Sequence, residues 1–147
     1  MIALVDYDLV FLEKSWFWLN DPEIKSLTMT PSFTKKDQQV FFESLPDKKD
    51  YWIKGVTYNN VPVGAMGLKH ITKKDAEYWG YIGEKEYWGK GIGSFMLDQA
   101  INKAVEQELE NIHLRVTKNN KKARDLYIHK GFRVSEDGDI EKYTLHL

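Results

Sequence analysis

The chain contains no cysteine among its 147 residues. Disulfide bonds, a thiol nucleophile and cysteine-ligated zinc are therefore excluded, and the composition fits a reducing compartment. The first residues, 1–5, lack the basic region of a secretory signal, and no apolar run approaches the ~20 residues that a membrane-spanning helix needs. We expect a cytoplasmic protein without a membrane partner.

An excess of one charge is also absent, because the net charge is only −1 at pH 7. A nucleic-acid partner is not expected, since such proteins usually carry a basic patch. Metal-binding patterns are missing as well: the four histidines are scattered and show no H-E-x-x-H spacing. We therefore expect no metal cofactor.

Aromatic residues, in contrast, are plentiful, with five Trp, eight Tyr and seven Phe. Such residues fill a core or line a ligand cleft. The chain shows no internal repeat, linker or low-complexity tract, and its length fits one domain over 1–147.

Hydrophobic periodicity and turn residues predict helices and strands in a mixed order. The expected elements are helices over 9–19 and 35–45, strands over 51–58, 61–71 and 76–83, a helix beginning near 92, a strand over 112–116, a helix over 120–130 and two strands flanking a turn at 137–138. This order predicts an α/β (α+β) fold with a mixed, mostly antiparallel sheet flanked by helices. Strands 76–83 and 112–116 are joined by a crossover helix and should be parallel, and splaying of the two would leave a cleft.

The loop over 87–94, with the sequence YWGKGIGS, joins a predicted strand to a predicted helix. Its glycines free the backbone, so that several N–H groups and the positive end of the helix dipole can bind phosphate. The spacing matches neither the Rossmann G-x-G-x-x-G pattern nor the Walker G-x-x-x-x-G-K-[ST] pattern. Dinucleotide and nucleoside triphosphate chemistry therefore lose their main support.

A second motif, N-x-x-A-x-x-L-Y followed by G-F, covers 120–132. Together the two motifs resemble the GNAT superfamily of acetyl-CoA-dependent N-acetyltransferases, whose loop pattern Q/R-x-x-G-x-G/A falls on Trp88, Gly91 and Gly93. The similarity extends from Tyr51 onward. It implies acetyl-CoA as the co-substrate of an acyltransferase.

The resemblance also implies which residues bind the coenzyme. The loop residues would bind the diphosphate, the backbone of one strand would pair with pantetheine, and Asn120 would hydrogen-bond the coenzyme arm. The loop residues are Trp88, Gly89, Lys90, Gly91, Ile92, Gly93 and Ser94, and the strand residues are Tyr81, Ile82 and Gly83. Trp88 replaces the basic or amide residue that the family usually has, which leaves backbone donors, helped by Lys90.

For catalysis, the resemblance assigns Tyr127 as the general acid at the thioester sulfur. An ordinary phenol and the departing thiol have similar pKa values, about 10 and 8.5. The alternative is a core aromatic residue. Glu77 is the preferred base, followed by Glu84 and Glu86, and the alternative for each is an exposed strand carboxylate or a surface ion pair. With no cysteine and no serine in a G-x-S-x-G context, we expect direct transfer without an acyl-enzyme.

The acceptor should be a primary amine of a small molecule, selected by the first half of the chain. Aromatic residues at 11 and 16–18 and the segment 28–31 could line its pocket or belong to the core. The pattern is similar to bacterial enzymes that acetylate nucleotide-linked amino sugars during polysaccharide synthesis. Two alternatives stay open: a protein N-terminal acetyltransferase of the ribosomal-protein type, and a non-catalytic coenzyme A binding module. A homodimer is compatible with the sequence.

Overall fold

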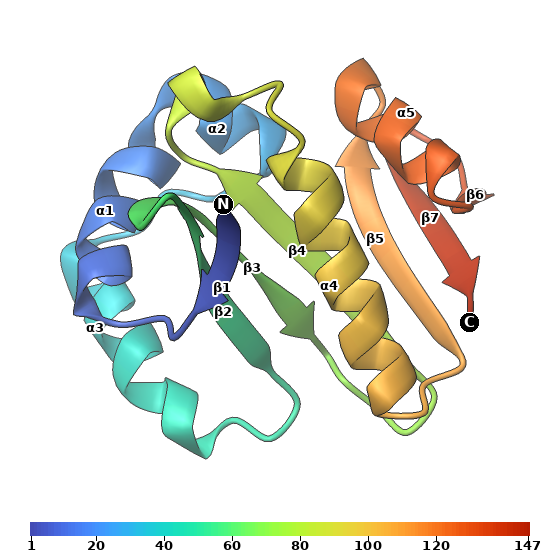
Figure 1. The fold of residues 1–147 in the computed structure, drawn as a ribbon, viewed down its shortest axis with the longest axis horizontal. Coiled ribbons are helices and arrows are strands. Elements are labelled where there is room, and N and C mark those ends of the chain that lie inside the picture. Colours follow the sequence, from blue (N-terminus) through green and yellow to red (C-terminus); the bar gives the residue numbers. More distant parts are fainter.

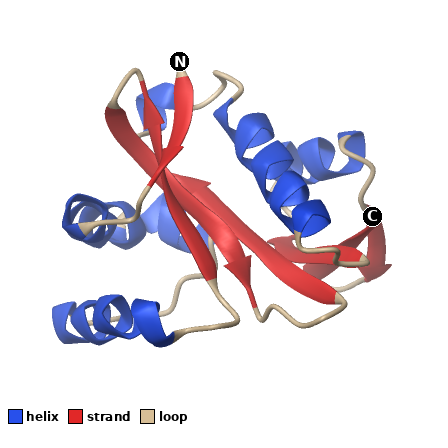
Figure 2. Ribbon diagram, turned by 60° about the horizontal axis from the view of Figure 1, so that its bottom comes forward, coloured by secondary structure: helices blue, strands red, loops and turns tan.

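A seven-stranded sheet with helices on both faces forms the structure, a computed structural model that describes residues 1–147 (Figures 1 and 2). The strands are β1 (Ile2–Val5), β2 (Trp52–Tyr58), β3 (Val61–Lys69), β4 (Asp75–Ile82), β5 (Asn111–Thr117), β6 (Arg133–Glu136) and β7 (Ile140–His146). The helices are α1 (Leu9–Asn20), α2 (Pro22–Leu27), α3 (Lys35–Ser44), α4 (Ile92–Glu106) and α5 (Lys121–His129), with 3₁₀ turns at Leu45–Asp47 and Lys85–Tyr87.

The sheet has the strand order β1-β2-β3-β4-β5-β7-β6. All neighbours are antiparallel except β4 and β5, which are parallel. The predicted fold class is therefore confirmed, including the parallel pair around the crossover helix α4.

Local chemistry explains most of the element boundaries. Thr34 and Asp37 form a reciprocal capping box at the start of α3. Asn59 and Asn60 adopt positive φ in the β2–β3 turn. Two elements were not predicted, β1 and α2. The helix end expected near residue 20 is correct for α1. Helix α2 begins directly afterwards, because the Asp21 side chain accepts hydrogen bonds from two backbone N–H groups and caps it.

Side chains alternate between the two faces of the sheet, so that each face has its own buried layer. Helix α4 covers one face through Ile92, Met96 and Leu97, which pack with apolar residues of the central strands. Helices α1 to α3 cover the other face (Figure 2), where Phe11 and Trp18 are buried. The two faces of β4 therefore meet different surroundings.

The parallel pairing of β4 with β5 is short. It joins only Asp75, Ala76 and Glu77 to their partners in β5, the last pair being Glu77 with His113. Beyond this point β4 stays paired with β3 and β5 stays paired with β7. The facing edges of β4 and β5 thus separate toward their C-terminal ends (Figure 1).

Helix α5 is fixed to β7 by a polar cluster. Arg124 Nε lies 2.8 Å from a Glu141 carboxylate oxygen and 3.1 Å from the Tyr143 hydroxyl oxygen, and its guanidinium also donates to the Lys118 carbonyl. Glu141 is only 4% exposed, so its charge needs this partner. The cluster sets the position of α5 beside β5.

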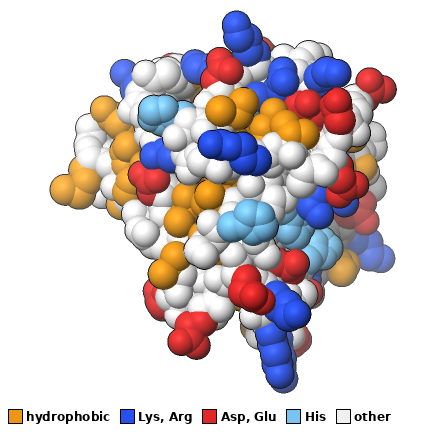
Figure 3. Space-filling model, turned by 90° about the vertical axis from the view of Figure 1, so that its right-hand side faces the viewer, with side chains coloured by type: hydrophobic (Ala, Val, Ile, Leu, Met, Phe, Trp, Pro, Cys, Tyr) orange, Lys and Arg blue, Asp and Glu red, His pale blue; other side chains and the backbone are white.

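The face that carries α5 and the C-terminal strands mixes cationic and anionic side chains, with small apolar areas between them (Figure 3). The edge strand β6 is short and exposed along its whole length, which limits pairing with other chains. None of the helices combines the length and hydrophobicity that crossing a bilayer requires.

Candidate active site

A cavity of about 1170 Å³ opens where β4 and β5 separate. It is larger than the ~300–1,000 Å³ of ordinary small-molecule pockets. Its lining includes the glycine loop and α5 on one side, and β4, α2 and the start of β2 on the other. A cavity of this size, with walls from both faces of the sheet, can hold two substrates end to end.

The glycine loop forms the wall at the start of α4. Gly89 and Gly91 adopt φ values of +79° and +81°, which favour glycine. Gly91 is the N-terminal cap residue of α4 and offers no side-chain acceptor, so the first N–H groups of the helix lack a side-chain cap. Ile92, Gly93 and Ser94 line the cavity. This geometry is suited to binding a phosphate group.

The β4 backbone offers further free groups to the cavity. Gly83 N–H donates to the Val63 carbonyl at 2.7 Å. Because antiparallel pairing alternates, Tyr81 also directs its backbone toward β3, whereas Tyr78, Gly80 and Ile82 direct theirs toward the gap. Of the three expected pantetheine partners, Ile82 directs its backbone toward the gap, whereas Tyr81 and Gly83 direct theirs toward β3.

The Trp88 side chain bonds the backbone of β4 rather than pointing a donor at the phosphate-binding loop. Its indole Nε1 donates to the Ile82 carbonyl at 3.0 Å and fixes the end of β4. Lys90, expected to help with phosphate, is exposed and does not line the cavity. Lys122 of α5 does line it, and its Nζ lies 3.9 Å from where a β-carbon on Gly89 would be. The cation over the loop thus comes from α5, which the sequence reasoning missed.

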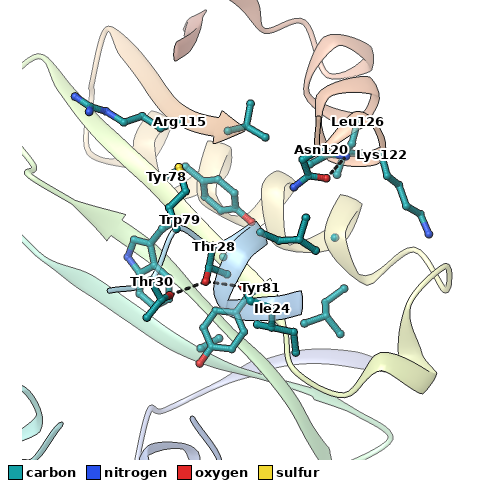
Figure 4. A pocket seen from close by; sticks show the side chains of 18 of the residues that line it. Ile24, Thr28, Thr30, Tyr78, Trp79, Tyr81, Arg115, Asn120, Lys122 and Leu126 are labelled. Carbon is teal, nitrogen blue, oxygen red and sulfur yellow. Dashed lines mark hydrogen bonds between the residues drawn. The ribbon is translucent and has the colours of Figure 1, made fainter. Parts of the chain in front are cut away.

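Asn120 and Tyr127 lie together on the α5 side of the cavity. Asn120 Oδ1 accepts the Ala123 N–H as a helix cap, and Figure 4 shows its amide nitrogen turned toward the cavity. Tyr127 packs against Phe132 and Tyr143, with ring centroids 6.0 and 6.3 Å away. Burial raises the pKa of Tyr127 to about 12, so the phenol is neutral at physiological pH.

Glu77 is the only one of the three candidate bases that lines the cavity. It is mostly buried, with Lys69 Nζ at 3.6 Å and His113 Nε2 at 3.7 Å. Burial lowers the pKa of His113, so that ring is neutral at pH 7 and Lys69 supplies the counter-charge. Glu84 instead accepts a hydrogen bond from the Trp18 indole, and Glu86 is exposed outside the cavity.

The opposite wall is aromatic. Trp79 stacks between Tyr51 and Tyr81, with centroids 6.1 and 6.5 Å away. The segment 28–31 also lines this part of the cavity, which was one of the two positions expected for it, the other being the core. Figure 4 shows the Thr28 and Thr30 hydroxyls bonded to each other. The aromatic residues at 11 and 16–18 lie outside the cavity.

Two cationic side chains, Lys69 and Arg115, lie on the aromatic side of the cavity, and only one of them has an ion-pair partner. Lys69 is paired with Glu77, as described above, whereas Arg115 of β5 lines the cavity and makes no ion pair. The structure holds no group of three or more histidine or carboxylate side chains that could ligate a metal.

The glycine loop and the Asn-containing helix thus lie beside each other on one side of the cavity. Residues 14–132 match the family model of the acetyltransferase (GNAT) family. The chain belongs to the GNAT acetyltransferase family. A curated relative, GCN5-related N-acetyltransferase 6 of Arabidopsis thaliana, is 30% identical over 95 residues, which is 62% of this chain. The alignment spans only 33% of the length of that chloroplastic protein.

Solved structures share the GNAT fold along nearly the whole chain. Campylobacter jejuni N-acetyltransferase PseH is 21% identical, with a TM-score of 0.76 over 99% of this chain and 97% of its own. Spermidine N-acetyltransferase from Vibrio cholerae is 20% identical, with a TM-score of 0.87 over 99% of this chain and 95% of its own. At these identities the likeness extends to the fold alone.

Gly91 provides a test of the loop geometry. An added β-carbon would meet no atom within 4 Å, so the requirement for glycine is the φ of +81° rather than crowding. A β-branched residue there costs at least about 1–2 kcal/mol, so Gly91→Val should weaken coenzyme A binding about 10-fold or more in calorimetry.

Gly138→Val is the matched control, because Gly138 also has positive φ but lies in the turn between β6 and β7, outside the cavity. It should lower the melting temperature without changing coenzyme A affinity. Equal affinity of the Gly91 variant and the parent would contradict the assigned role of the loop.

Proposed function

We propose that this chain transfers an acetyl group from acetyl-CoA to a primary amine of a small molecule. The observation that supports this most is the cavity at the β4–β5 gap, which joins a phosphate-binding loop to an aromatic acceptor wall. Structures of relatives with the same fold are described in complex with acetyl coenzyme A, for PseH, and with CoA and spermine, for the spermidine enzyme.

The residues present fit the coenzyme. The free N–H groups at the start of α4 and Lys122 would bind its phosphates, and the backbone of Gly80 and Ile82 would hydrogen-bond the pantetheine arm. Asn120 would contact the arm through its amide nitrogen. The coenzyme supplies the activated acetyl group as a thioester.

Transfer requires a neutral amine on the acceptor side. Glu77 lies on that side and would accept the amine proton, directly or through water. The amine nitrogen bonds to the acyl carbon, the carbon–sulfur bond breaks, and the departing thiolate takes up a proton from water to become the free thiol. Both substrates occupy one cavity, so no acyl-enzyme is needed.

Tyr127 would assist the departing sulfur from the α5 side. With its pKa raised to about 12, complete proton transfer to a thiolate with a conjugate-acid pKa near 8.5 is uphill. The phenol would therefore act chiefly as a hydrogen-bond donor to the developing thiolate. This revises the expectation that the two groups have matched basicity.

For the acceptor, we propose a nucleotide-linked amino sugar. The stacked wall of Tyr51, Trp79 and Tyr81 suits a planar base or the apolar face of a sugar. Arg115, without an ion pair, would bind an acceptor phosphate. A polyamine is less well matched, because both cavity carboxylates, Glu23 and Glu77, already pair with lysines.

The test is thiol release from acetyl-CoA with an amine panel of nucleotide-linked amino sugars, free amino sugars, polyamines and N-terminal peptides. We expect the highest kcat/KM with a nucleotide-linked amino sugar. Arg115→Ala should raise KM about 10-fold or more for that acceptor, the scale of one charge-assisted contact, and leave free amino sugars unaffected. No thiol release with any amine would contradict the proposed transfer.

The raised pKa of Tyr127 gives a pH prediction. The protonated phenol is the active form and persists up to about pH 12, while the amine becomes neutral as pH rises. Turnover should therefore increase with pH and show no decline through about pH 10, the ordinary tyrosine pKa.

Tyr127→Phe should lower kcat by about 10²-fold, the scale of a lost proton-donating group, with coenzyme A affinity unchanged. Tyr58→Phe is the control, because Tyr58 packs on the core outside the cavity. The prediction would be contradicted if turnover of the parent declined with a midpoint below about pH 10 and this decline disappeared in Tyr127→Phe. The pKa of Tyr127 would then be that of an ordinary tyrosine.

A further inference from the structure

Tyr78 occupies the closed end of the gap between β4 and β5. It directly follows Glu77, the last β4 residue that pairs with β5. Its side chain lies on the α4 face, in the same buried cluster as Met96, and is only 5% exposed. Tyr78 also lines the cavity, into which Figure 4 shows it pointing.

The Tyr78 hydroxyl makes no hydrogen bond within the protein, and its oxygen is not fully buried, so it is accessible from the cavity that Tyr78 lines. The comparison with Tyr143 is direct, because the hydroxyl of that fully buried tyrosine bonds both Arg124 and Glu141. The Tyr78 hydroxyl instead lies beside Gly80, where an added β-carbon would come within 2.5 Å of the oxygen. Gly80 thus leaves room for this hydroxyl at the edge of the gap.

Tyr78 and Tyr127 are two neutral phenols near the same gap, on β4 and α5. Burial raises the pKa of Tyr78 well above its ordinary value, with a further contribution from Tyr127 nearby. No basic side chain bonds the Tyr78 hydroxyl. Tyr78 therefore retains its proton and is available as a donor.

The positions of the loop and of the closed end of the gap along β4 indicate which part of the coenzyme the Tyr78 hydroxyl would contact. The phosphate-binding loop follows the C-terminal end of β4, and the closed end of the gap lies toward its start. A coenzyme bound by its phosphates at the loop would extend along β4, so that its acyl end comes closest to Tyr78. The carbonyl oxygen is the strongest hydrogen-bond acceptor of that acyl end.

We propose that the Tyr78 hydroxyl donates a hydrogen bond to the acyl carbonyl oxygen of the bound thioester, while Tyr127 faces the sulfur. This inference rests on the proposed acetyl transfer. Charge develops on the carbonyl oxygen as the amine attacks, so the bond strengthens during the reaction and lowers the barrier. Tyr78 is then a catalytic residue in addition to Tyr127 and Glu77.

The test is Tyr78→Phe, which keeps the buried ring and removes only the hydroxyl. Two readouts are needed: kcat, and the carbonyl vibration of acetyl-CoA labelled with ¹³C at the acyl carbon and bound without acceptor. We expect kcat to fall about 10²-fold, the scale of one lost oxyanion donor. The carbonyl band of the parent complex should lie at lower wavenumber than in water and move back in the variant.

Tyr58→Phe, outside the cavity, should change neither readout. Coenzyme A has no acyl carbonyl, so its affinity in calorimetry should be unchanged by Tyr78→Phe, which also shows that the variant is folded. An unshifted carbonyl band or an undiminished kcat in Tyr78→Phe would overturn the inference about Tyr78. Failure of the parent to bind acetyl-CoA would instead contradict the proposed function.

Discussion

The short parallel ladder between β4 and β5 is the constraint on which the rest of the structure depends. Each of the two strands is held along its outer edge, β4 by β3 and β5 by β7, while their inner edges pair only up to Glu77 and His113. Backbone N–H and C=O groups left on those inner edges need partners. One carbonyl, that of Ile82, is bonded by the Trp88 indole. The remaining groups form a ready-made edge for an extended ligand.

Because side chains alternate along β4, one face of the strand lines the part of the cavity proposed for the acyl donor, and the other face lines the part proposed for the amine acceptor. Tyr78 and Gly80 face α4, with Tyr127 nearby, whereas Glu77, Trp79 and Tyr81 face the helices of the first half. An acyl donor and an amine acceptor can therefore approach from opposite faces of one sheet and meet where the strands separate. The Arg124–Glu141 pair matters to this arrangement because it holds α5, and with it Asn120 and Tyr127, against β7.

The sequence was sufficient for the β2–β3 hairpin and for the parallel pair β4 and β5, because hydrophobic period, turn residues and handedness are local or general rules. The four-residue strand β1 has too little pattern to be predicted and depends on pairing with β2. The backbone directions of Tyr81 and Gly83 could not be predicted from the sequence, because a shift of one residue in register reverses them. The positions of Lys122 and Tyr78 depend on how α5 and β4 pack, which spacing along the chain does not encode.

A crystal structure of the protein with bound coenzyme A would test the central claim most directly. The account predicts the diphosphate at the backbone N–H groups of 91–94, the pantetheine arm beside the backbone of Gly80 and Ile82, and the sulfur between β4 and Tyr127. A coenzyme bound on another surface, or β4 and β5 paired along their full length with the gap closed, would contradict it.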